Sequence, residues 1–232
     1  MLSKEQLHMS SKKQLLTGPL SPSTWVSLLL TVLLFPLGLC LPGWWGWENG
    51  PIENTQVVIL GAGAFLSWFA ARRNRGDIRI RNLWLWVIPV WLLMAGRELS
   101  WGRAFLEPVA LGPEGPVFPS IRAIWYGPYV YPFLTVIAIA SLAGLWRNFS
   151  WAYIKPKLSL CVVDGALLIL AAVAAQLIFE RNWLPALTPY HQILEEWSEL
   201  IAYWCMVSIA FTLGFQNERS QGEKQLVQSA GR

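Results

Sequence analysis

The segment Gly96–Phe105, GRELSWGRAF, places an arginine and a glutamate side by side directly after a fully apolar run. A charged side chain inside a bilayer is costly, so such residues normally face the interior of a helix bundle and pair with one another. A guanidinium can bind a carboxylate through two parallel hydrogen bonds. Arg97 and Glu98 therefore indicate a polar site within an otherwise apolar part of the chain.

A second group of ionisable residues opens the last apolar run, HQILEEWSELIAYW. Glu195 and Glu199 are four residues apart and share a helix face, and His191 lies one turn earlier on the same side. At about 1.5 Å per residue, Glu199 lies about 9 Å below the outer boundary of its helix, and Glu98 about 22 Å above the inner boundary of its own. In a hydrocarbon core about 30 Å thick, a residue about 9 Å below the outer boundary is about 21 Å above the inner one, so the two glutamates lie at the same depth. Glu53 enters at the same level from a third helix.

Acidic residues outnumber basic ones at this level, so some must be protonated, reach water or bind a cation. One interpretation is structural: Arg97 and one glutamate pin two helices together, while Glu195 and Glu196 reach the wet interface. The interpretation that we favour is an outward-facing site that binds a ligand or protons. Its predicted residues are Glu53, Arg97, Glu98, Arg103, His191, Glu195 and Glu199.

The sequence predicts no metal site and no cofactor, and it assigns no catalytic residue. Glu98, His191, Glu195 and Glu199 offer oxygen and imidazole ligands, but a lone histidine at a helix entrance is more often a cap or a surface residue. None of the three cysteines lies in a CxxC motif. The chain also lacks a P-loop, a dinucleotide-binding fingerprint and a nucleophile elbow. Asp164, in the fifth apolar run, is expected to bond a neighbouring helix rather than to relay protons.

The composition places these residues in a membrane protein. Of the 232 residues, 54% are hydrophobic and only 14% are charged, whereas soluble domains carry about 25% charged residues. We predict an all-α, polytopic bundle of six transmembrane helices in one domain, residues 23–216, between tails at 1–22 and 217–232. The predicted spans are Trp25–Leu41, Thr55–Ala71, Leu83–Phe105, Tyr129–Trp146, Leu158–Phe179 and Ile193–Phe215.

The basic residues predict the orientation of the bundle. Fourteen of the 18 lysines and arginines fall in the two tails and in the second and fourth connections. By the positive-inside rule, we expect both termini of this multi-pass protein to be cytoplasmic. This distribution explains the net charge of +4 better than binding of nucleic acid does.

Two segments, WENGPIENTQ and GRELSWGRAF, resemble an uncharacterised family of bacterial multi-spanning membrane proteins. That family has an E-D-G-x-x-E segment before one helix and a G-E-E-I-S-W-G-Q-R segment at the end of the next. The matching residues are Glu48, Gly50, Glu53, Gly96, Glu98, Ser100, Trp101, Gly102 and Arg103. Arg97 stands where the family has the first glutamate of its pair. The resemblance implies a bacterial inner-membrane protein and brings no known activity with it.

Three classes of function remain open. We favour a protein that transports or binds a cationic, polar or lipid-linked ligand. The alternatives are an enzyme that acts on a lipid-linked substrate at the outer interface and a non-catalytic accessory subunit of a membrane complex. The expected partners are the lipid bilayer, a small polar or cationic ligand or lipid headgroup, and a second copy or a partner complex. The tryptophan-rich connection after the first run indicates an interfacial aromatic belt or a platform over a headgroup or sugar.

Overall fold

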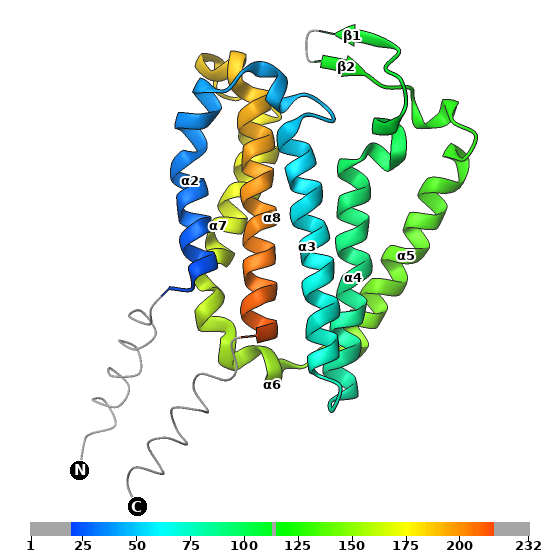
Figure 1. The fold of residues 1–232 in the computed structure, drawn as a ribbon, viewed down its shortest axis with the longest axis vertical. Coiled ribbons are helices and arrows are strands. Elements are labelled where there is room, and N and C mark those ends of the chain that lie inside the picture. The colour runs from blue at the N-terminus through cyan, green and yellow to red at the C-terminus, as the bar shows by residue number, and fades with distance from the viewer. Residues whose placement is uncertain (1–19, 113–114, 216–232) are drawn as a thin grey trace, which may run out of the picture.

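The computed structural model describes residues 20–112 and 115–215, which form a bundle of long helices and one small hairpin (Figure 1). The predicted tails at 1–22 and 217–232, with the basic residues counted in them, lie outside the described residues except for positions 20–22. Six helices of the described chain are long and apolar enough to cross a membrane. The predicted all-α class is therefore confirmed, and the six candidate spans of the described residues agree in number with the six that the sequence predicts.

Connections of different length join the long helices of the bundle. The long helices are α2 (Pro22–Cys40), α3 (Pro51–Arg73), α4 (Ile78–Glu98), α5 (Gly127–Asn148), α7 (Val162–Val173) and α8 (His191–Phe215). Shorter elements are η1 (Gly43–Gly46), η2 (Ser100–Phe105), β1 (Ala110–Gly112), β2 (Gly115–Val117), η3 (Ile121–Ala123), α6 (Trp151–Ile154), η4 (Lys155–Cys161), η5 (Ala174–Phe179) and η6 (Pro185–Tyr190). The strands pair antiparallel, with Leu111 opposite Pro116. The connection between α4 and α5 carries η2, this hairpin and η3.

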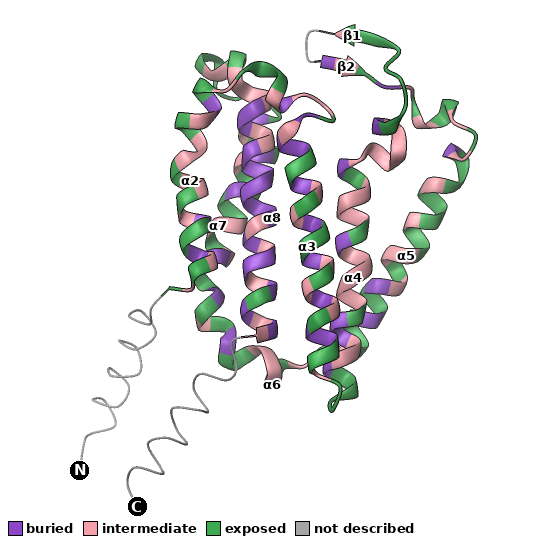
Figure 2. Cartoon of the chain, viewed as in Figure 1, coloured by how far each residue is buried: buried purple, intermediate pink, exposed green. Residues whose placement is uncertain are grey.

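Helix α8 is the centre of the bundle. It packs against α2, α3 and α7, while α4 packs between α3 and α5. Figure 2 shows that α8 is mostly buried and that α5 is not. In an apolar stretch of 18 residues within each segment, 67% of the residues are buried for Pro185–Phe215, which contains α8, and 11% for α5. Polar side chains on α8 therefore face other helices, whereas α5 is covered on one side only.

Local sequence signals set where the helices begin and how closely they approach. The Ser21 hydroxyl accepts from the N–H of Thr24 at the start of α2, and Asp77 accepts from two N–H groups at the start of α4. Helices α3 and α4 approach closely at Gly63, where a Cβ atom would lie 2.7 Å from the ring of Trp91. Capping thus sets where α2 and α4 begin, and Gly63 allows α3 and α4 to pack closely.

The third span differs from its prediction. We expected a helix over Leu83–Phe105, but α4 begins at Ile78 and ends at Glu98. The chain turns because Ser100, Trp101 and Gly102 have positive φ angles of 47°, 56° and 91°, which a helix does not tolerate. Counted from Ile78, Glu98 lies about 30 Å along the helix. It is the last residue of the helix, and not about 22 Å along it as counted from Leu83.

The two ends of the bundle differ in charge. The α6 end carries the connection between α3 and α4 and the connection between α5 and α6. Arg79, at the start of α4, joins the two by donating to the Phe149 carbonyl at 2.7 Å. Eight of the 12 arginines and lysines in the described residues lie in these connections or in the elements that adjoin them: Arg72, Arg73, Arg75, Arg79, Arg81, Arg147, Lys155 and Lys157. The opposite end carries the β1–β2 hairpin (Figure 1) and is called the hairpin end below.

Candidate functional site

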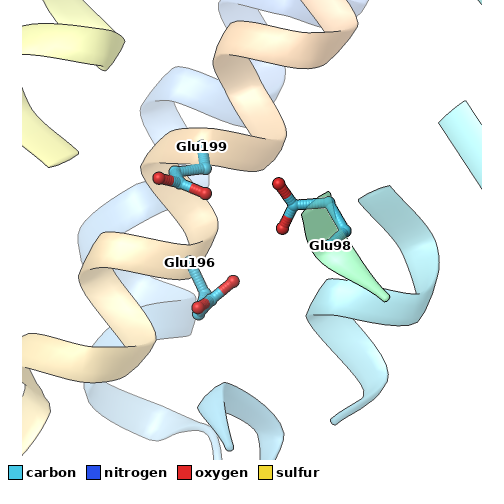
Figure 3. Close-up of side chains that lie close together, drawn as sticks. All are labelled: Glu98, Glu196 and Glu199. Carbon is cyan, nitrogen blue, oxygen red and sulfur yellow. The ribbon is translucent and has the colours of Figure 1, made fainter. Parts of the chain in front are cut away.

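Three glutamates from two helices converge near the hairpin end. Glu98 ends α4, and Glu196 and Glu199 lie in the second and third turns of α8. One carboxylate oxygen from each lies within 4.8 Å of the others, and Figure 3 shows the three groups facing a common space. Glu98 and Glu199 are only 5% and 7% exposed. We call these three residues the carboxylate cluster.

Arg97 and Tyr203 hold one side of the carboxylate cluster. Arg97 Nη2 donates to Glu199 Oε1 at 3.1 Å, and its Nε lies 4.0 Å from Glu98 Oε1. The Tyr203 hydroxyl accepts from Arg97 at 3.4 Å and donates to Glu98 Oε1 at 2.7 Å. The guanidinium therefore contacts two carboxylates and the phenol between them.

Two glutamines hold the other side. Gln176 donates to Glu199 Oε1 at 3.0 Å from the π-helical turn η5, a type of turn that is common at functional sites. Gln56 donates to Glu196 Oε2 at 2.9 Å and to the Glu196 carbonyl at 2.8 Å. Each carboxylate of the cluster is thus oriented by a side-chain donor through one of its oxygens.

The chain after α4 fixes the position of Glu98. Trp101 folds back onto Gly96, where a Cβ atom would lie 2.5 Å from the indole ring. Ser100 donates to Glu48 Oε1 at 2.6 Å, and Arg103 contacts the same oxygen at 3.4 Å. The turn that ends α4 is therefore tied to the segment that precedes α3.

Two of the predicted site residues lie beside the carboxylate cluster without joining it. Glu53 is buried in the first turn of α3 and accepts from the backbone N–H of Asn49. It lies one turn before Gln56, toward the hairpin end. Arg103 does not reach the cluster either, because it pairs with Glu48.

The structure places His191 and Glu195 outside the carboxylate cluster. The His191 ring contacts the Thr188 carbonyl through Nδ1 at 2.7 Å, so it bonds its own preceding turn. Glu195 was expected to share the face of Glu199, but Glu196 takes that place in the carboxylate cluster. Residues three apart on a helix share a face, just as residues four apart do. Glu196 joins Glu199 in the cluster because its side of α8 faces α3 and α4.

A second buried carboxylate lies among α2, α7 and α8. Asp164, fully buried, accepts from Thr24 and Ser208 at its Oδ2 and from Ser27 at its Oδ1, at 2.6–2.8 Å. Ser21 and Ser23 bond each other at 2.7 Å and continue to Thr24 and Ser208 at 2.8 Å. Asp164 therefore joins neighbouring helices, in the way expected from the sequence.

No family model matches the chain, and no curated protein sequence or solved structure shows a significant match to it. The resemblance carried by WENGPIENTQ and GRELSWGRAF therefore stays a prediction. The geometry of the site has to supply the functional argument. Within residues 20–112 and 115–215, the carboxylate cluster is the group of acidic, histidine or cysteine side chains close enough to share one cation.

Proposed function

We propose that this is a multi-pass protein of a bacterial inner membrane, with both termini in the cytoplasm, that binds a cationic ligand from the outer side as the first step of transport. The convergence of Glu98, Glu196 and Glu199 carries the proposal. Only one guanidinium, that of Arg97, contacts these carboxylates among the described residues. The local excess of acid favours a positively charged ligand.

The position of Glu98 supports the same conclusion. It stands at the C-terminal end of α4, where the helix dipole disfavours an anion and favours a cation. A carboxylate buried at such a place needs positive charge close by. Arg97 provides part of it, and a bound cation would provide the rest.

A cavity at the hairpin end supports approach from outside. It has a volume of about 340 Å³ and is lined by aromatic and polar side chains, including Trp44, Trp47, Glu48 and Asn49. The N–H of Asn49 donates to Glu53, which lies one turn before Gln56 on α3. Acidic groups thus continue from this cavity toward the carboxylate cluster.

Ligand-induced stabilisation tests the proposal. Purified full-length protein in lipid nanodiscs is heated with CaCl2, MnCl2, ethanolamine, choline or putrescine, and with glucose and glycerol 3-phosphate as neutral and anionic controls. A ligand that binds only the folded state raises the Tm. We expect at least one cation to raise the Tm of the wild type, and Glu199→Gln to remove that rise.

Glu107→Gln is the matched control, because Glu107 is exposed in the loop after η2 and lies outside the cluster. It should keep the full cation-induced rise. The proposal is wrong if no cation raises the Tm, or if Glu199→Gln keeps the rise. For a cation that binds, uptake into proteoliposomes tests the transport step; equal uptake by Glu98→Gln and the wild type would exclude transport through this site.

A further inference from the structure

We propose that the carboxylate cluster binds a hard divalent cation such as Ca²⁺ or Mn²⁺, with Gln56 Oε1 as a fourth ligand. This inference rests on the proposed function and names the class of cation. It departs from the sequence-based prediction of no metal site. That prediction counted His191 among the ligands, whereas the structure offers Glu196 and Gln56 instead.

The spacing of the carboxylates fits one shared ion. Two ligands of an ion are at most two metal–oxygen bonds apart, which is about 4.6–5.2 Å for Ca²⁺ and about 4.0–4.2 Å for Mg²⁺. The ligand oxygens of Glu98, Glu196 and Glu199 lie within 4.8 Å of one another. This spacing allows one oxygen-ligated ion to contact all three carboxylates.

Gln56 gives an independent reason to expect a ligand. Its side chain is 0% exposed, and its Oε1 has no hydrogen-bond partner in the described part of the chain. An unpaired buried acceptor costs about 1–3 kcal/mol. The same amide contacts the Glu196 carboxylate through Nε2, so its oxygen lies beside the cluster. Amide oxygens are ordinary ligands of Ca²⁺.

The charges balance with a divalent ion. Three ionised carboxylates and Arg97 sum to a charge of −2, which one divalent cation neutralises. Because a buried net charge is costly, a neutral site is favoured. The identified donors occupy Oε1 of Glu98, Oε1 of Glu199 and Oε2 of Glu196. Each carboxylate keeps its other oxygen to turn toward the ion.

The ligand type selects among metals. The proposed ligands are all oxygen atoms, which suit Ca²⁺, Mg²⁺ and Mn²⁺, whereas Zn²⁺ sites usually contain imidazole or thiolate ligands. The described histidine, His191, bonds Thr188 instead, and Cys161 and Cys205 are not members of the cluster. Four protein oxygens leave the remaining positions of Ca²⁺ to water, so the ion can exchange, as a transported ion must.

Mn²⁺ titration tests the inference, with the loss of the free Mn²⁺ signal in electron paramagnetic resonance as the readout. We expect the full chain in nanodiscs of uncharged lipid to show one saturable Mn²⁺ site. Because Mg²⁺ loses its water reluctantly and needs a stricter geometry, Ca²⁺ should displace Mn²⁺ at lower concentration than Mg²⁺ does. Glu196→Gln and Glu98→Gln should each weaken Mn²⁺ binding by about tenfold or more, and Gln56→Leu should weaken it severalfold.

Glu195→Gln is the matched control, since it removes the neighbouring acid on the same helix and leaves the cluster intact. It should bind Mn²⁺ as the wild type does. The metal inference is wrong if Mn²⁺ binds no better than to empty nanodiscs, or if Glu196→Gln and Glu98→Gln bind it normally. If ethanolamine, choline or putrescine still stabilises the wild type in that case, the proposed function stands. If no cation binds, both proposals fail.

Discussion

At the residue scale, the hydroxyl of Tyr203 connects Arg97 to Glu98. Tyr203→Phe keeps the ring but removes the donor, so Glu98 Oε1 retains only the Arg97 Nε contact at 4.0 Å. Because an unsatisfied buried acceptor costs about 1–3 kcal/mol, we expect the free energy of unfolding in mixed micelles to fall by about that amount. Tyr129→Phe, which alters an exposed ring, is the control. An equal loss in both variants would contradict this role for Tyr203.

The sequence predicts some site residues better than others. Arg97 and Glu98 stand out because charge is rare in apolar runs, and Glu199 follows from its matching depth. The choice between Glu195 and Glu196 depends on where α3 and α4 lie around α8, which helix periodicity alone does not determine. Gln176 had a usable signal, since a single amide in an apolar run tends to face the bundle interior.

At the element scale, Asp164 closes a ring of hydrogen bonds that joins α2, α7 and α8. Besides Asp164, the ring consists of the hydroxyl groups of Ser21, Ser23, Thr24 and Ser208. These five groups make five contacts, but the four hydroxyls supply only four hydrogens. An asparagine amide at position 164 would donate to Thr24 and Ser208 and still accept from Ser27. Every contact would then have a hydrogen.

We therefore expect Asp164→Asn to unfold in mixed micelles with a free energy equal to that of the wild type or higher. In Asp164→Leu, leucine has a volume similar to that of aspartate but cannot accept the three hydrogen bonds from the buried hydroxyls. Each hydroxyl left without its acceptor costs about 1 kcal/mol or more. Leucine should thus cost about 3 kcal/mol. If asparagine destabilises the protein as much as leucine does, the ring does not hold these helices together.

The helices themselves are largely predictable from apolar length, because a span needs about 20 such residues. The end of α4 is not. A glycine at position 102 signals a turn, but the positive φ angles of Ser100 and Trp101 depend on contacts with distant residues. Ser100 bonds Glu48, and Tyr126 donates to the Trp101 carbonyl at 3.2 Å. Tertiary contacts of this kind decide where the helix stops and hence where Glu98 lies.

At the scale of the whole molecule, the orientation in the membrane decides which side a ligand comes from. The hairpin lies at one end of the bundle, and the arginine-rich segment 72–81, around the connection between α3 and α4, lies at the other (Figure 1). The cavity lined by Trp44 is at the hairpin end. Basic connections stay in the cytoplasm. We therefore expect the hairpin end, which is nearer to the carboxylate cluster, to face outward.

Cysteine labelling in intact cells tests this orientation. In a background with Cys40, Cys161 and Cys205 replaced by alanine, Leu111→Cys places a thiol on the hairpin, where Leu111 is 79% exposed. Gly76→Cys places one in the connection between α3 and α4, and a Cβ atom there meets nothing within 4 Å. A membrane-impermeant maleimide should label the first variant in intact cells and the second only after the cells are opened. Labelling in the reverse order would put the carboxylate cluster on the cytoplasmic side, and a ligand would then have to enter from the cytoplasm.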